Sequence, residues 1–248
     1  MSRHPVAGKR VLVTRAARDA DRWATRLAAL GADPVVMPCL VCQPILDGET
    51  GRALRDAVAG AAWLLVTSSR GCAAAARLLQ GSTLPGGLRV AAVGPATAVA
   101  ARKHLGRVDF VPRAGTSSGL ARELIELIRL EETAGTAGVV LVGAEGGRDD
   151  AVALLEAAGL NVSRVAVYRT IPAPASATKR DLAADGIQIV LLASPSAVTG
   201  LVGRALLPGS VQVVTIGPTT SAAAVAAGLV ITAEAARPTF EGILEAIV

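Results

Sequence analysis

The sequence predicts an α/β fold with two parallel sheets, one in each half of an internal duplication. Short runs of Val, Leu and Ile alternate along the chain with amphipathic stretches rich in Ala and Leu. Strands that are apolar on both faces and alternate with helices are typical of parallel sheets covered by helices. Similar segments also recur in the two halves of the chain, which indicates a duplicated domain.

The predicted strands are short apolar runs bounded by Gly, Pro or polar residues. Their number suits two sheets of five strands better than one large sheet. They cover residues 10–14, 33–39, 63–67, 89–93, 108–111, 139–142, 162–168, 187–193, 212–216 and 229–232. The clearest helical patterns between them cover residues 19–30, 70–79, 117–128 and 149–158.

The duplication is visible at matching positions in the two halves. Residues 11–13 (VLV) recur as residues 140–142 (VLV), and residues 94–97 (GPAT) recur as residues 217–220 (GPTT). The segments keep their order, and their spacing drifts only slightly. A duplicated βα domain therefore accounts for the pattern.

Two divisions into domains fit the sequence. The simpler one cuts the chain at the Gly/Thr/Glu-rich residues 131–138. The other uses the equivalent segments 40–44 and 168–172, each ending in proline, as paired connections between domains. One domain then comprises residues 1–39 and 173–248, and the other comprises residues 45–167. The sequence pattern alone does not choose between these divisions.

The composition excludes several classes of protein. Hydrophobic residues make up 52% of the chain and charged residues 18%, which excludes wholesale disorder. Aromatic residues are only 2%, so stacking platforms for single-stranded nucleic acid are not expected. The net charge of +5 is scattered, which is unlike a nucleic-acid patch but suits a small polyanionic ligand.

No segment of the sequence resembles a membrane anchor or an export signal. No apolar run approaches the ~18 residues of a membrane span. At the N-terminus, Lys9 and Arg10 precede only a few apolar residues, which is unlike a signal peptide. We expect a cytoplasmic protein that binds neither membranes nor nucleic acid.

The cysteines are expected to be structural. Cys39 and Cys42 form a C-x-x-C motif, which in redox proteins stands at the start of a helix. Here prolines flank the motif and apolar residues fill it, so the segment is predicted to be extended. A zinc site would need more ligands than the two histidines of the sequence supply.

Four predicted loops share one construction: each follows a strand, contains small or hydroxyl residues and opens a helix. In parallel sheets, ligands bind at the carboxyl ends of strands, where helix N-termini attract anions. Each loop taken alone is better explained by helix capping, as Ser194 before Pro195 illustrates. Their repetition in both halves favours a ligand cleft. The loops are residues 67–70, 94–97, 194–196 and 217–220.

No nucleotide-binding or hydrolytic motif accompanies these loops. Residues 143–148 (GAEGGR) lack the G-x-G-x-x-G spacing, and no G-x-x-x-x-G-K-[ST] loop is present. Tyr168, the only tyrosine of the sequence, is a candidate for acid–base chemistry. A lone tyrosine is usually a packed amphipathic residue. At the proposed hinge, however, its hydroxyl would face the cleft between the domains and act as a proton donor.

Taken in order along nearly the whole chain, the motifs resemble those of uroporphyrinogen-III synthases. They are residues 11–15 (VLVTR), 67–68 (TS), 92–98 (AVGPATA), 146–148 (GGR), 167–170 (VYRT), 194–198 (SPSAV), 216–220 (IGPTT) and 237–242 (RPTFEG). The sequence departs from the family pattern at Ala16, at Gly71 and Cys72, and at Ala193.

The resemblance implies two flavodoxin-like domains joined by a two-stranded connector, which supports the second division. It implies a monomer that cyclises hydroxymethylbilane to uroporphyrinogen III, with inversion of ring D and loss of water. It implies no metal and no organic cofactor. The carboxylate-rich substrate agrees with the positive net charge.

The resemblance also assigns residues. Tyr168 matches the tyrosine that helps the substrate hydroxyl leave, and is the expected catalytic residue. The expected substrate-binding residues come from the matching motifs and the loops that open helices. They are Arg15, Ser68, Arg70, Thr97, Gly147, Ser194, Ser196 and Thr220.

Two other functions are compatible with the same pattern. A tetrapyrrole-binding sensor without catalytic activity could use the same fold, although no DNA-binding helix-turn-helix pattern is left over. A solute binder of the periplasmic type also has two α/β lobes with crossing connections, but the N-terminus shows no export signal.

Overall fold

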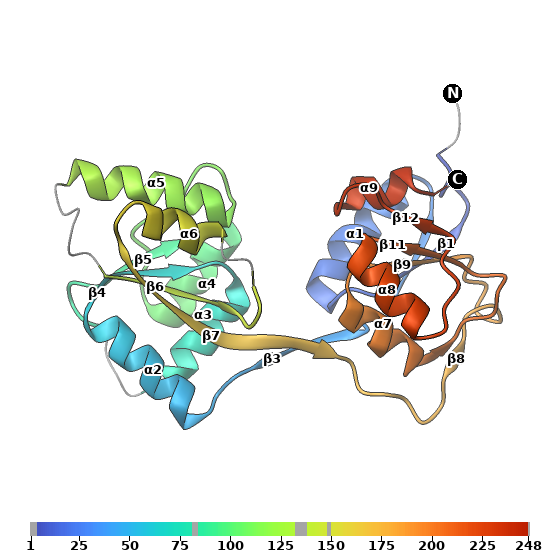
Figure 1. Cartoon of the computed structure of the whole chain (residues 1–248), viewed down its shortest axis with the longest axis horizontal. Helices are drawn as coiled ribbons and strands as arrows, with labels where there is room; N and C mark the ends of the chain where they lie inside the picture. Colours follow the sequence, from blue (N-terminus) through green and yellow to red (C-terminus); the bar gives the residue numbers. More distant parts are fainter. Residues whose placement is uncertain (1–3, 81–83, 132–137, 148–149, 248) are drawn as a thin grey trace. The chain divides into compact units, whose positions relative to one another are not determined.

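The computed structural model shows two compact units, each built around one five-stranded sheet (Figure 1). It describes residues 4–80, 84–131, 138–147 and 150–247. Unit 1 comprises Met1–Cys42 and Thr170–Val248, and unit 2 comprises Gln43–Arg169. Residues 132–137, which make up most of the simpler predicted cut, lie outside the described residues.

The large sheet of unit 1 is parallel throughout. Its strand order β12-β11-β9-β1-β2 is the 2-1-3-4-5 order of flavodoxin-like folds when the strands are counted along the unit. The strands are β1 (Arg10–Val13), β2 (Asp33–Val36), β9 (Ile189–Leu192), β11 (Gln212–Thr215) and β12 (Ala233–Glu234). Two short strands, β8 (Arg180–Asp181) and β10 (Ala205–Leu206), pair separately.

Helices cover both faces of this sheet because its strands are apolar on both sides. Val11 and Val13 of β1 point into one core, whereas Leu12 points into the other. The first core is completed by α1 (Ala17–Ala29) and α9 (Phe240–Glu245). The second is completed by α7 (Pro195–Val202) and α8 (Pro218–Ala226).

The sheet of unit 2 has the order β3-β7-β6-β4-β5, and the first residues of β3 and the last residues of β7 belong to unit 1. Its strands are β3 (Leu40–Pro44), β4 (Ala61–Val66), β5 (Arg89–Ala92), β6 (Gly138–Ala144) and β7 (Asn161–Pro172). The last four pair in parallel. The edge strand β3 runs antiparallel to β7, because Ile45 N donates to Val167 O and Ala173 N donates to Cys39 O. The predicted parallel sheet therefore carries one antiparallel edge.

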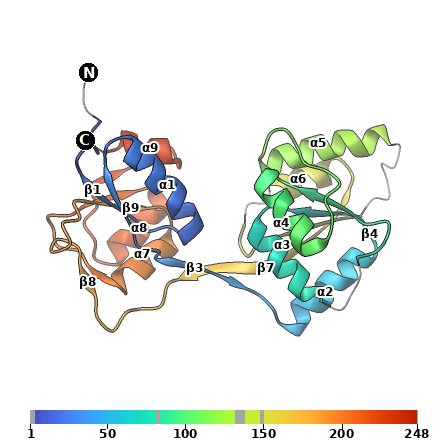
Figure 2. The same ribbon diagram turned by 180° about the vertical axis from the view of Figure 1, so that it is seen from behind.

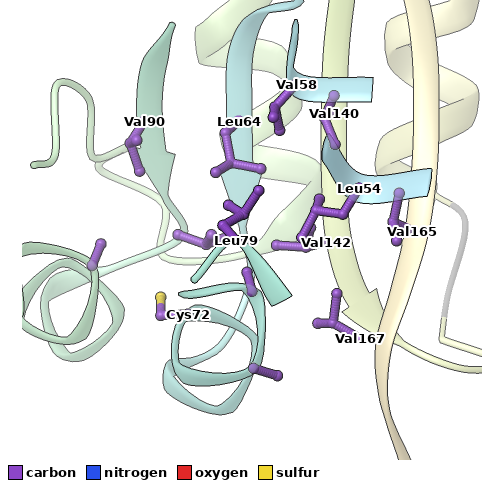
Figure 3. Close-up of a cluster of buried hydrophobic side chains, with 14 of the residues drawn as sticks. Leu54, Val58, Leu64, Cys72, Leu79, Val90, Val140, Val142, Val165 and Val167 are labelled. Carbon is purple, nitrogen blue, oxygen red and sulfur yellow. The ribbon is translucent and has the colours of Figure 1, made fainter. Parts of the chain in front are cut away.

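Two helical layers enclose the sheet of unit 2, and Figures 1 and 2 show them from opposite sides. One layer comprises α2 (Gly48–Ala59), α3 (Ser69–Leu78) and α4 (Pro95–Leu105), and the other comprises α5 (Ser117–Leu130) and α6 (Asp150–Ala157). Figure 3 shows the core of unit 2 beneath α2, α3 and α4, in which Leu54 of α2 lies near Val142 of β6 and Val165 of β7.

Two predicted strands are wrong, for the same physical reason. Within 108–111, only Phe110 makes a single bridge to Ala91, because the Asp109 carboxylate accepts from Val90 N at 2.7 Å. Within 229–232, the Thr232 hydroxyl accepts from Val213 N at 3.1 Å, and the strand begins only at Ala233. In each case a side chain takes the N–H group that a backbone carbonyl would otherwise bind.

The discontinuous division stays a prediction, and fragments test it. We expect residues 43–169 expressed alone to fold cooperatively, because they retain four parallel strands and both helical layers. Residues 1–132 should not fold, because they lack the central partners β9 and β6 in the two sheets. Thermal melts followed by circular dichroism and the dispersion of amide NMR signals measure this. An unfolded 43–169 fragment alongside a folded 1–132 fragment would show that the discontinuous division is wrong.

Candidate functional site

The predicted site residues of unit 2 lie at the carboxyl edge of its sheet. Ser68 follows β4, Thr97 lies in the first turn of α4 after β5, and Gly147 lies in the turn after β6. Arg70 belongs to the first turn of α3, and Tyr168 pairs with Ala144, the last residue of β6. The strand β5 lies on one side of β4 and the next strand, β6, lies on the other, so the topological switch point of the sheet is between β4 and β6. Sheets of this kind bind ligands at their switch point.

A β-bulge aims the Tyr168 side chain. Gly143 pairs with Ala166 and Ala144 pairs with Tyr168, so Val167 is an extra residue in β7. Strict alternation would place Val167 and Tyr168 on opposite faces. The bulge allows both to pack against the core beneath α2, α3 and α4, and Val167 is drawn there in Figure 3.

The half-buried Tyr168 hydroxyl meets Ser68. Ser68 Oγ donates to Tyr168 Oη at 3.2 Å and accepts from Gly71 N at 3.0 Å. Ser68 is thus the N-cap of α3, as its place in the sequence predicts, and it also contacts the only tyrosine. These two residues are 100 positions apart in the sequence, and no sequence pattern pointed to the contact.

Arg164 holds the turn that contains Gly147. Its Nη2 donates to Ala144 O at 3.1 Å and to Gly147 O at 2.9 Å. Glu145 N donates in turn to Tyr168 O at 2.8 Å, which ties the turn to β7. Sequence reasoning did not give Arg164 a role. Arg148 of the GGR motif lies outside the described residues.

Unit 1 gathers its predicted site residues in the same way. Arg15 follows β1, Ser194 caps α7 and accepts from Ala197 N at 3.2 Å, and Thr220 lies in the first turn of α8. Ser196 lies in the first turn of α7 and is half-buried. Within this unit the switch point lies between β1 and β9.

Trp23 and Asp19 hold the guanidinium of Arg15 at this edge. Its guanidinium carbon lies 4.8 Å from the centroid of the Trp23 ring, and Nη2 lies 4.0 Å from Asp19 Oδ2. Its Nε is buried and has no hydrogen-bond partner among the described residues. Beneath it, the fully buried Thr14 hydroxyl donates to Leu191 O at 2.7 Å and ties β1 to β9.

The four helices that begin at these loops share an electrostatic feature. The first turns of α3, α4, α7 and α8, all within the described residues, carry no acidic residue. Their N-terminal positive ends are therefore not neutralised by side chains of their own first turns, although Glu234 accepts from Ser221 at the start of α8. Thr97 and Thr220 are only 6% and 3% exposed, so their hydroxyls offer an anion little surface, and the N–H groups of the helix N-termini are the candidate donors.

The cysteines have structural roles, and Cys72 lies next to the site, where its N donates to Ser68 O at 3.1 Å and its Sγ to Thr97 O at 3.8 Å. Cys42 is on β3, so the C-x-x-C segment is extended as predicted. Burial raises the pKa of Cys39 to about 12 and that of Cys72 to about 11, which keeps both thiols protonated and unreactive at neutral pH.

In the described ranges no group of three or more His, Cys, Asp and Glu side chains could hold a metal ion. Nor do these ranges contain a helix long and apolar enough to cross a membrane.

The sequence comparisons agree on one family. A family model described as "Uroporphyrinogen-III synthase HemD" matches residues 21–245. The chain is 26% identical over 205 residues to "Porphyrin biosynthesis protein HemD" of Ruminiclostridium josui and 29% identical over 178 residues to the "Uroporphyrinogen-III synthase" of Synechococcus elongatus. These matches cover 80% and 68% of this chain but only 40% and 64% of the relatives' own lengths.

Solved structures show the same fold. A mutant uroporphyrinogen III synthase of the extremely thermophilic bacterium Thermus thermophilus superposes with a TM-score of 0.51 at 17% identity, covering 96% of both chains. The uroporphyrinogen-III synthetase of Helicobacter pylori superposes with a TM-score of 0.53 at 14% identity, covering 96% of this chain and 97% of the other.

Proposed function

We propose a function from one premise, that the chain belongs to the uroporphyrinogen-III synthase family. The protein cyclises hydroxymethylbilane to uroporphyrinogen III, with inversion of ring D and loss of water, in the biosynthesis of tetrapyrroles such as haem, sirohaem and cobalamin. The observation that carries this proposal is the Tyr168 hydroxyl, which lies beside Ser68 at the carboxyl edge of a flavodoxin-like sheet.

Tyr168 assists the departure of the substrate hydroxyl. The nitrogen of the pyrrole ring that carries the hydroxymethyl group supplies an electron pair, and the carbon–oxygen bond breaks. Tyr168 donates a proton to the departing oxygen, which leaves as water. The azafulvenium ion that remains loses its N–H proton to the tyrosinate, which restores Tyr168 and leaves an electrophilic azafulvene. The remaining work of the protein is to fold the chain of pyrroles, to stabilise charge and to exclude water.

Helix N-termini are the proposed binding sites for substrate carboxylates. Four helix N-termini without acidic first turns offer backbone N–H groups to anions, and the net charge of +5 adds a favourable field. Arg15 and Arg70 contribute positive side chains. Gly147 and Ser194 belong to loops at the same edges, and Ser196 lies in the first turn of α7. Because the protein mainly binds carboxylates and the substrate supplies the electron pair, few acid–base residues are needed.

The protein works as a cytoplasmic monomer, with hydroxymethylbilane as its partner and with neither metal nor organic cofactor. The reaction itself supports the absence of a metal and of an organic cofactor, because the substrate supplies the electron pair and one protein hydroxyl supplies the proton. No electron enters or leaves during the cyclisation.

The decisive test is isomer formation by purified, chelator-treated protein. Given hydroxymethylbilane produced enzymatically in the same reaction, the protein is expected to yield the type III isomer. The type I isomer forms spontaneously, so its amount measures the uncatalysed cyclisation in the same reaction. Chromatographic separation of the oxidised products measures both isomers. Formation of the type I isomer alone would contradict the proposal and favour a tetrapyrrole-binding sensor.

A further inference from the structure

Two hydrogen bonds fix the direction in which the Ser68 hydroxyl points. Its oxygen accepts from Gly71 N at 3.0 Å, as an N-cap does. Its proton is directed to Tyr168 Oη, which lies 3.2 Å away. Helix α3 therefore presents an oriented donor to the phenol oxygen.

An oxygen that accepts from Ser68 keeps its own proton available. The Tyr168 proton does not return to Ser68, so it can be directed at a substrate oxygen. The bond from Ser68 also stabilises the negative charge that develops on the phenol oxygen as this proton leaves. Both effects favour proton donation by Tyr168.

The surrounding packing holds the pair in place. The β-bulge at Val167 seats the tyrosine ring against the core of unit 2. A Cβ atom added at Gly71 would lie 3.2 Å from Ser68 Oγ and 3.9 Å from Tyr168 Cε1. Gly71, at which this sequence departs from the family pattern, thus lies directly under the hydrogen-bonded pair.

We infer that Ser68 is a positioning residue that orients the Tyr168 hydroxyl for proton donation, rather than a residue that binds a substrate carboxylate. This inference rests on the proposed function for its kinetic consequence but not for the hydrogen bond itself. Its chemistry is specific: a side chain at position 68 must both cap α3 and donate to the phenol oxygen.

The test uses Ser68→Gly, because glycine replaces an N-cap at low cost while removing the donor. We expect kcat for type III formation to fall about threefold to tenfold, the range that loss of one hydrogen bond supports, with KM unchanged. Ser68→Thr should restore kcat, because threonine supplies both the cap and the donor. In a Tyr168→Phe background, Ser68→Gly should have no further effect on kcat.

A readout without turnover keeps the inference independent of the proposed function. With a single tyrosine in the chain, protein labelled with [¹³Cζ]tyrosine gives one phenol resonance. Ser68→Gly should shift this resonance and Ser68→Thr should restore it. The matched control is Thr116→Gly, which removes the N-cap of α5, where Thr116 Oγ1 accepts from Gly119 N at 3.0 Å. The control should leave both the resonance and kcat unchanged.

The outcomes separate the two proposals. A wild-type protein that makes only the type I isomer contradicts the proposed function, whereas a shifted resonance in Ser68→Gly still supports the hydrogen bond. An unshifted resonance overturns the inference. A rise in KM with unchanged kcat also overturns it, because Ser68 would then bind substrate. The same holds for an equal loss of kcat in the Tyr168→Phe background.

Discussion

Tyr168→Phe is expected to lower kcat for type III formation by about 10²–10⁴-fold, the usual contribution of general acid catalysis. The substitution removes the hydroxyl and keeps the ring. The ring's packing against the core of unit 2 should therefore survive. Ser68 loses its acceptor, but both residues are half-buried, so water can replace the lost partner and the free energy of unfolding should change little.

The comparison variants for this prediction are Thr97→Ala and Thr220→Ala. Both should reduce kcat less than Tyr168→Phe does, because backbone N–H groups at the same helix ends can still hold a carboxylate. Type III formation by each purified variant is the measurement, and thermal melts show whether each variant is folded. Wild-type turnover in Tyr168→Phe would make Tyr168 a packing residue, and catalysis would then depend on the reactivity and folding of the substrate.

The parts of the fold that were predictable are those that burial dictates. Runs such as residues 189–192 are apolar on both faces and are fully buried between two helical layers. The loops that open helices were also predictable, because Ser68 and Ser194 cap α3 and α7 with their side chains as the capping preference indicates. The carboxyl ends of the strands then place the predicted site residues at the edge of each sheet.

The parts that were not predictable depend on contacts between distant segments. The bulge at Val167 and the bond from Ser68 to Tyr168 join segments that no local pattern relates. The antiparallel position of β3 depends likewise on its pairing with β7. Arg164 looks like any strand arginine in the sequence, and its role in holding the Gly147 turn follows only from the register of β6 and β7.

Gly200 marks a close approach inside unit 1 that alanine cannot occupy. A Cβ atom added there would lie 1.9 Å from Cys39 O and 3.2 Å from Ala173 N. These two atoms are joined by the hydrogen bond from Ala173 N to Cys39 O, at 2.8 Å. Helix α7 therefore packs directly on the backbone of the two segments through which the chain passes between the units.

Gly200→Ala is consequently expected to reduce the free energy of unfolding by about 3 kcal/mol or more, at the upper end of the cost of overpacking. The obstruction is backbone, so either α7 moves away from the sheet or the bond between Cys39 and Ala173 breaks. The matched control is Gly51→Ala in α2, where the nearest atom, at 3.1 Å, is Arg55 Nη1, a side-chain end that donates to Leu78 O and can shift more easily than backbone. That change should cost little, because alanine also favours the helix. Urea denaturation of both variants measures the difference, and equal midpoints would mean that α7 is not held against these segments.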